Sequence, residues 1–214
     1  RDGARQQAKQ LDQERATGRL RGVLHGIPIG IKDLIDVQRT VTAAGSPLRA
    51  ASEAASSDAA LVASLRAAGA LILGKTVTTQ FACFDPSPTR NPWNAAHTPG
   101  GSSSGSAASV AAGMVPAAIG SQTGGSITRP AAFCGVAGCK PTFGTVSLDG
   151  VVPVAKSLDH PGPIARSVRD LALVLAALKG ESDGGVDVSR FERRPPRLGR
   201  LRGFSEHLVE PAMR

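Results

Sequence analysis

Two glycine–serine clusters contain the side chains best suited to chemistry. The first, GGSSSGS, spans residues 100–106, and the second, TGGS, spans residues 123–126. A serine hydroxyl is a weak nucleophile until a neighbouring base takes its proton. Neither cluster contains a histidine. The clusters therefore indicate attack by a serine that is activated by a base from elsewhere in the chain.

A lysine on an apolar strand is the candidate base. In HGIPIGIKDLIDV (25–37), isoleucines recur with period two, which predicts a strand whose opposite face carries Lys32. Burial disfavours the charged form of a lysine and lowers its pKa, so a buried Lys32 can act as a neutral base. The alternative is a structural lysine that pairs with Asp33 or extends to water.

The second cluster places two glycines directly before Ser126. Backbone amides can point at a developing oxyanion only where no side chain intrudes. We therefore expect the backbone of this loop to hold a carbonyl oxygen while Ser126 attacks the carbon. A plain turn is the alternative for residues 123–126, and a flexible linker is the alternative for residues 100–106.

One phosphate-binding pattern is matched by its letters alone. GALILGKT (69–76) satisfies G-x-x-x-x-G-K-[ST]. A phosphate-binding loop follows a strand, whereas the four residues between these glycines are themselves an apolar strand. Gly69 is better explained as the end of the preceding helix.

A second motif suggests a different class of enzyme. GSSSG (101–105) matches the G-x-S-x-G nucleophile elbow of α/β-hydrolases, with Ser103 as the nucleophile. That elbow needs a buried strand directly upstream, and NPWNAAHTPG is not one. A Ser–His–Asp hydrolase that uses His160 or His207 stays open as the alternative.

The elements that must position these residues alternate between strands and helices. We predict strands around Lys32, at 70–73 and at 114–120. Helices are predicted at 4–16, at 58–68 with Ser57 as the cap, at 106–112 and at 168–180 with a Ser167–Asp170 capping box. This alternation predicts an α/β fold. Residues 181–196 are rich in Gly, Pro and charge, which is typical of a linker, and a strand of a further unit is predicted to begin near residue 197.

The length and composition favour one globular domain. The chain has 214 residues, of which 41% are hydrophobic, 20% charged and only 3% aromatic. Residues 1–22 and 190–214 carry +7 of the net charge of +8, without interleaved aromatics, so direct binding of nucleic acid is not expected. The three cysteines have no metal-ligand spacing, and no apolar run would span a bilayer. A reduced cytoplasmic protein without a metal site is expected.

Three segments resemble the amidase signature family. They are GIPIGIKDLIDV (26–37), the block from Asn91 to Gly144, and SLDHPGPIARSVRD (157–170). They cover about residues 20–180 in the family's order, and the glycine–serine block is the hallmark of the family. The resemblance is to the bacterial branch that includes malonamidase-like enzymes and the glutamyl-tRNA amidotransferase A-type chains.

The resemblance implies an amidase with a Ser–cis-Ser–Lys triad. Ser126 would be the nucleophile, Ser102 the bridging serine after a cis Gly101–Ser102 peptide bond, and Lys32 the base. The oxyanion hole would consist of Thr123, Gly124, Gly125 and Ser126, and Ser103 would support the site. Neither a metal nor an organic cofactor is implied.

An arginine three residues after the predicted nucleophile resembles malonamidase-like enzymes. Its guanidinium suits a substrate carboxylate, which it can hold through two parallel N–H···O bonds. Arg129 is therefore predicted to bind substrate. The alternative is a structural ion pair of Arg129 with Asp149 or Asp159.

The family's members are much longer than this chain. The resemblance implies an α/β/α fold with a mixed central sheet, of which residues 1–180 form the N-terminal half, 181–196 a linker or surface loop, and 197–214 the start of the C-terminal half. We therefore expect a fragment. The expected partner is a small amide substrate, and a homodimer, an amidotransferase component or an inactive binding fragment are open alternatives.

Overall fold

The computed structural model describes residues 2–181, 197 and 203. The predicted linker at 182–196 and nearly all of the predicted C-terminal unit lie outside the described residues. The elements follow one another in the order α1 Asp2–Ala16, β1 Pro28–Lys32, α2 Pro47–Ala50, α3 Ala60–Ala67, β2 Leu71–Thr76, the 3-10 turn η1 Gln80–Ala82, α4 Ser104–Ala111, β3 Ala117–Gln122, α5 Thr128–Cys134, β4 Ala137–Gly138, β5 His160–Ala165 and α6 Val168–Leu178.

The five strands form one mixed sheet in the order β2-β1-β3-β5-β4. Strand β1 pairs in parallel with both β2 and β3, whereas β5 runs antiparallel to β3 and β4. The carboxyl ends of β1 and β3 therefore meet at one edge of the sheet. Because the first cluster precedes α4 and the second follows β3, this edge is where the predicted site residues can come together.

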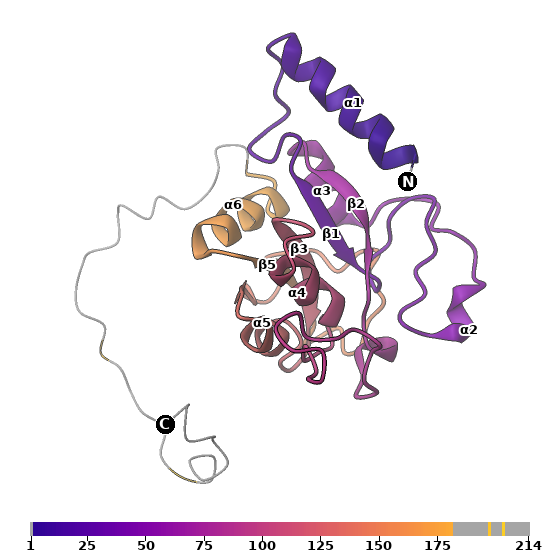
Figure 1. The fold of residues 1–214 in the computed structure, drawn as a ribbon. Helices are drawn as coiled ribbons and strands as arrows, with labels where there is room; N and C mark the ends of the chain where they lie inside the picture. Colours follow the sequence, from indigo (N-terminus) through magenta and orange to yellow (C-terminus); the bar gives the residue numbers. More distant parts are fainter. Residues whose placement is uncertain (1, 182–196, 198–202, 204–214) are drawn as a thin grey trace.

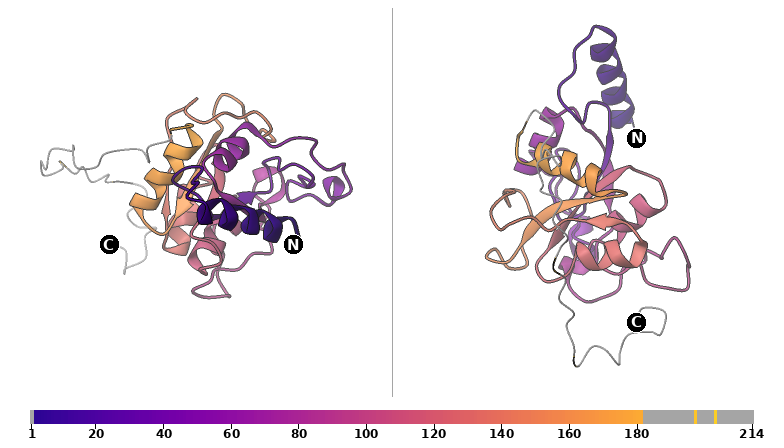
Figure 2. Two further views of the ribbon diagram at one scale, coloured as in Figure 1. Left: turned by 90° about the horizontal axis from the view of Figure 1, so that it is seen from above. Right: turned by 90° about the vertical axis from the view of Figure 1, so that its left-hand side faces the viewer.

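Helices cover both faces of the sheet (Figures 1 and 2). On one face, α3 and α6 contact each other and enclose the larger apolar core, to which β1 contributes Ile29 and Ile31. On the other face, α4 and α5 pack over a smaller core that includes Ala118 of β3 and Ile164 of β5. The α/β/α fold with a mixed central sheet is confirmed.

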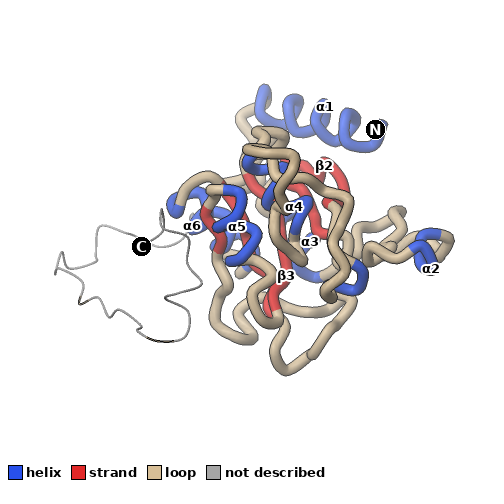
Figure 3. Tube along the Cα trace, turned by 60° about the horizontal axis from the view of Figure 1, so that its bottom comes forward, coloured by secondary structure: helices blue, strands red, loops and turns tan. Residues whose placement is uncertain are grey.

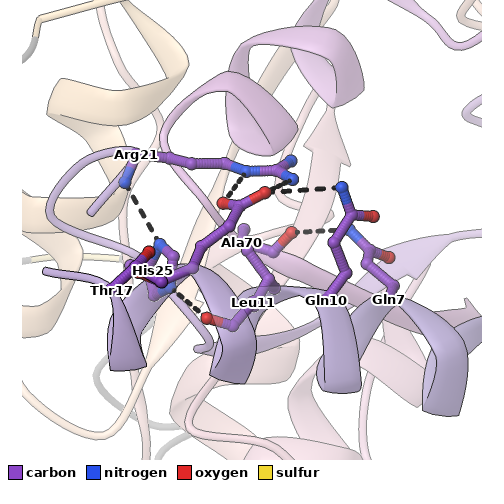
Figure 4. A network of polar contacts seen from close by, with 8 residues as sticks. Gln7, Gln10, Leu11, Thr17, Arg21, His25 and Ala70 are labelled. Atoms are coloured by element: carbon purple, nitrogen blue, oxygen red, sulfur yellow. Dashed lines mark hydrogen bonds and ion pairs between the residues drawn. The ribbon is translucent and has the colours of Figure 1, made fainter. Parts of the chain in front are cut away.

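Helix α1 extends along one end of the molecule and is attached mainly by polar contacts (Figures 1 and 4). Its one fully buried apolar residue is Leu11. Gln7 donates a hydrogen bond to the carbonyl oxygen of Ala70 at 3.2 Å, and the ring of His25 contacts the carbonyl oxygen of Leu11 at 2.9 Å. The predicted helix is therefore present, held to the strand end by a few specific contacts.

The predicted start of helix α3, with Ser57 as its cap, is wrong. The residue that precedes α3 is Ala59, and no side chain caps the helix. The amides of Ala59 and Ala60 instead donate to the carbonyl oxygens of Asp36 and Asp149. Tertiary hydrogen bonds thus replace the cap that Ser57 was expected to supply. At α6, by contrast, Ser167 accepts the amide of Asp170 at 3.1 Å as predicted.

The strand His160–Ala165 was not predicted, because its sequence, HPGPIA, contains two prolines. A proline cannot donate to a strand ladder, so it is tolerated only where no partner strand needs the amide. Strand β4 pairs only with Ile164 and Ala165, which leaves the positions of Pro161 and Pro163 without a partner strand on that side. The strands predicted at 70–73 and 114–120 are present as β2 and β3, but both begin and end later in the sequence than predicted.

Long loops connect the central elements, and the longest one within residues 2–181 joins β2 to α4 (Figure 3). This loop contains η1 and leads into the first glycine–serine cluster.

Among the residues that the structure describes, no helix has the length and apolar character needed to cross a membrane.

Candidate active site

Lys32 is the last residue of β1 and is fully buried, with 0% of its surface exposed. Side chains alternate along a strand, so Ile29 and Ile31 enter the larger core while Lys32 points to the α4 side. Asp33, the alternative partner, pairs instead with Lys75 of β2, with 2.9 Å between the carboxylate oxygen and Nζ. The interpretation of Lys32 as an edge lysine paired with Asp33 is therefore wrong.

Three serines surround the Lys32 amine. Nζ lies 2.7 Å from Ser102 Oγ, 2.9 Å from Ser103 Oγ and 2.9 Å from Ser121 Oγ, and it also donates to the carbonyl oxygen of Ser121 at 3.2 Å. Within the described residues, no carboxylate lies within ion-pair distance of this amine. Burial therefore lowers the pKa of Lys32 to about 7, and the charge of Asp159 opposes that shift only in part.

The first cluster lies over the end of β1. The Gly101–Ser102 peptide bond is cis, as predicted. The carbonyl oxygen of Ser102 accepts the amide of Thr79 at 3.2 Å, and helix α4 begins two residues later. Ser103 Oγ donates to the carbonyl oxygen of Ser121 as well as accepting from Lys32. The cluster is therefore a buried, hydrogen-bonded turn and not a flexible linker.

The second cluster is the loop between β3 and α5. The amide of Ser103 donates to the carbonyl oxygen of Ser126 at 3.2 Å, which joins the two clusters. In the part of the chain that the structure describes, the amides of Gly124, Gly125 and Ser126 donate to no protein acceptor, and the Ser126 hydroxyl has no hydrogen-bond partner. These donors and this hydroxyl are thus available to a ligand.

Gly124 shows that the small residues of this loop are not explained by packing. Its φ is not positive, and a Cβ added to it would meet no atom within 4 Å. At Gly120 of β3, in contrast, a Cβ would lie 2.8 Å from Ser103 Oγ, so that glycine is needed for the close approach of the first cluster to β3. Close packing therefore accounts for Gly120, whereas no contact within the described residues requires a glycine at position 124.

Arg129 lies on α5, beside the first cluster. Its Nε and Nη2 donate to the carbonyl oxygen of Gly101 at 3.0 and 2.8 Å. Among the described residues it forms no ion pair, so the alternative of a pair with Asp149 or Asp159 is wrong. The predicted contact with a substrate carboxylate would have to use the remaining N–H groups of the guanidinium.

A pocket of about 290 Å³ opens next to this guanidinium. The loop after β2, the start of the first cluster and helix α5 form this pocket. Its lining residues are Thr79, Cys83, Phe84, Pro86, Ser87, Thr98, Gly100, Gly101, Arg129 and Phe133. The pocket therefore borders the peptide that precedes Ser102 and has room for a small organic molecule.

Sequence reasoning missed two polar residues of the site. Ser121 contacts Lys32, and Gln122 accepts the amides of Ile127 and Thr128 at 2.8 and 2.9 Å while it donates to the carbonyl oxygen of Gly124. Both lie at the carboxyl end of β3. Their signal was available, because polar residues at the end of a strand parallel to β1 must come to the same sheet edge as Lys32.

The two rival motifs lack their structural context. Strand β2 continues through Gly74, Lys75 and Thr76, so the phosphate-binding pattern lies in a strand and not in a loop. The residues directly before Ser103 form no strand, and the ring of His160 contacts the carbonyl oxygen of Gln122 and the ring of Phe143. His207 lies outside the described residues.

A family model named Amidase matches residues 1–205. The chain belongs to the amidase family. It is 50% identical over 184 residues to the A-type component of glutamyl-tRNA(Gln) amidotransferase from Roseiflexus castenholzii, and 41% identical to a component of 1-carboxybiuret hydrolase from Pseudomonas sp. (strain ADP). Among solved structures, the peptide amidase of Stenotrophomonas maltophilia is 45% identical, with a TM-score of 0.79 over 90% of this chain.

The matched proteins are all longer than this amidase-family chain. It covers 37% of the amidotransferase component, 50% of the hydrolase component and 41% of the peptide amidase. The shares of this chain that are covered are 83%, 99% and 90%. The predicted family membership is confirmed, and the chain spans half or less of these relatives.

Proposed function

We propose that this amidase-family chain carries the catalytic centre of an enzyme that hydrolyses a carboxylic amide through Ser126, Ser102 and Lys32. The observation that carries the proposal is the Lys32 amine, which is fully buried, lies 2.7 Å from Ser102 Oγ and has no carboxylate within ion-pair distance among the residues that the structure describes. An amine whose pKa is about 7 is a base near neutral pH.

We propose the following mechanism, in which the proton transfer from Ser126 to Ser102 is an inference and not an observed contact. Neutral Lys32 takes the proton of Ser102, Ser102 takes that of Ser126, and the Ser126 oxygen attacks the amide carbon. The amides of Thr123, Gly124, Gly125 and Ser126 stabilise the oxyanion that forms. The amide nitrogen leaves with a proton returned through Ser102, and an acyl ester remains on Ser126. Water then attacks that ester by the same proton route and releases the acid.

The selectivity proposal concerns Arg129. Two of its N–H groups hold the carbonyl oxygen of Gly101, and its guanidinium lines the pocket of about 290 Å³. We propose that its remaining N–H groups bind a carboxylate on the substrate. A small amide that carries a carboxylate would then be preferred to a neutral one.

A fluorophosphonate probe tests the proposed nucleophile. It should label Ser126 in the complete protein, and Ser126→Ala should lose both labelling and ammonia release from small amides while its circular dichroism stays unchanged. Ser104→Ala offers a matched control, because Ser104 lies in the first cluster and its hydroxyl contacts Ser87 and Val77, not Lys32. Labelling mapped to Ser103 instead would favour the nucleophile elbow.

The amidotransferase alternative is favoured by one observation, the 50% identity to an amidotransferase component. In that case ammonia would pass to a partner protein. The two functions differ in the free ammonia that appears per acid formed. A ratio of one in the presence and absence of partner proteins supports the hydrolase, whereas a ratio that falls when a partner is added supports the transferase.

A further inference from the structure

Asp159 is a buried carboxylate whose partners are all neutral. It is 6% exposed, and it lies directly before β5. Oδ2 accepts the amides of Val154 and Ala155 at 2.8 and 3.0 Å, and Oδ1 accepts the hydroxyl of Thr123 at 2.5 Å. No lysine or arginine among the described residues pairs with it. Burying an ionised carboxylate without a cation is costly, so these three hydrogen bonds must offset its desolvation.

These hydrogen bonds connect the turn at residues 154–159 to Thr123, the first residue of the second cluster. The two backbone amides fix the carboxylate on the 154–159 turn, which leaves Oδ1 directed at Thr123. The rest of the 123–126 loop is held by other groups, since Gln122 donates to the carbonyl oxygen of Gly124 and the Ser103 amide donates to that of Ser126. Asp159 supplies the hydrogen bond that holds the side chain of Thr123.

We propose that Asp159 is a positioning residue, which holds the Thr123 hydroxyl and thereby sets the path of the loop that carries the oxyanion amides and Ser126. This inference rests on the proposed function. Asp159 touches neither substrate nor reacting atoms in this account. It acts through Thr123, and its effect belongs in the rate of attack by Ser126.

The same carboxylate acts on Lys32 through its charge. Among the strands and helices that contact β1, α4 and β3 bring no charged residue, and β2 brings Lys75, which is paired with Asp33. Two further charged or titratable groups near the two clusters are Arg129 on α5, which donates to the carbonyl oxygen of Gly101, and His160, which contacts the carbonyl oxygen of Gln122. The charge of Asp159 raises the pKa of Lys32 against the larger effect of burial. Removing that charge should lower the pKa of Lys32 further.

Asp159→Asn separates positioning from a merely structural role. An asparagine keeps the shape, but it replaces the charged acceptor of the Thr123 hydroxyl with a neutral amide, which holds that hydroxyl more weakly. In the complete protein we expect the rate constant for fluorophosphonate labelling at its high-pH plateau to fall about tenfold or more. The acid limb of its pH profile should move to lower pH. Asp149→Asn, which changes an exposed carboxylate, should leave plateau and limb unchanged.

Thr123 provides the second test, which holds even where Asp159→Asn fails to fold. Thr123→Val removes the hydroxyl at constant shape and should lower the plateau about tenfold or more without moving the acid limb. Thr123→Ser restores a hydroxyl and should recover most of that loss. Equal labelling rates in Thr123→Val and Thr123→Ser, or an Asp159→Asn profile that superimposes on that of Asp149→Asn, would overturn the inference.

Ser126→Ala, labelled in parallel, distinguishes failure of the inference from failure of the proposed function. Unchanged labelling in Ser126→Ala would remove the proposed nucleophile and with it the basis of this role. Loss of labelling in Ser126→Ala, together with an Asp159→Asn protein that behaves as Asp149→Asn, would remove the role of Asp159 alone.

Discussion

Lys32 and Lys75 lie on neighbouring parallel strands, one step out of register, yet their amines differ in burial and in the presence of a carboxylate partner. In the β1–β2 pairing, Lys75 stands opposite Ile31, while Lys32 stands opposite Thr76. Lys75 meets the Asp33 carboxylate at 2.9 Å and remains partly exposed. Lys32 is fully buried, and within the described part of the chain its amine contacts three hydroxyls and a carbonyl oxygen but no carboxylate.

The alternation of side chains along the strand, and not the residue type, therefore separates the ion-paired Lys75 from Lys32, the proposed base. Asp33 follows Lys32 in sequence and therefore points to the opposite side, where it pairs with Lys75. Lys32 is left with partners that satisfy its hydrogen bonds without compensating its charge. Desolvation then decides its protonation state.

Exchanging the two lysines for arginine should give the largest contrast. Lys32→Arg should lower kcat/KM about 10²- to 10⁴-fold, the range that a general base contributes, because a guanidinium does not give up its proton. Lys75→Arg keeps the ion pair with Asp33 and should retain activity. Ammonia release measures both. An active Lys32→Arg variant would show that Lys32 is structural.

The free energy of unfolding should depend on pH because of the buried Lys32 amine. The pKa of Lys32 is about 7 in the folded chain and near its ordinary value of 10.5 in the unfolded chain. Between these pH values the unfolded state binds more protons, so the free energy of unfolding rises with pH. Below pH 7 the full penalty for the buried charge applies, and above pH 10.5 it vanishes.

Lys32→Met removes this dependence. The free energy of unfolding of the wild type, relative to Lys32→Met, should increase on the order of 5 kcal/mol from pH 7 to pH 10.5. Urea unfolding of both proteins at several pH values measures the difference. Lost hydrogen bonds to the three serines shift it by a constant amount, so a difference that does not vary with pH would contradict a neutral Lys32.

Much of this arrangement follows from the sequence, and the reasons for the failures are physical. Period-two isoleucines placed Lys32 on a strand, and the two glycine–serine clusters located the loops. The prolines of β5 concealed a strand, because their tolerance depends on how short β4 is. Ser57 failed as a cap, because amides of α3 bond to distant carbonyls. Tertiary contacts of this kind have no local signal.

Arg129→Lys should have a smaller effect, which depends on whether the substrate carries a carboxylate. An ammonium cannot hold the carbonyl oxygen of Gly101 and a carboxylate in the same geometry. If Arg129 binds substrate, kcat/KM should fall about 10- to 100-fold for malonamate and much less for the neutral propionamide. Equal losses on both amides, with a lowered Tm, would mean that Arg129 only holds the peptide before Ser102.

The most direct test of a neutral Lys32 is the pH dependence of kcat/KM in the complete wild-type protein. Protonation of the base should stop the reaction, so activity should fall as the pH decreases, through a single ionisation near pH 7. Any residual activity of Lys32→Arg should lack this limb. A profile that stays flat from pH 5 to pH 9, or a limb that persists in Lys32→Arg, would contradict the role of Lys32 as the base.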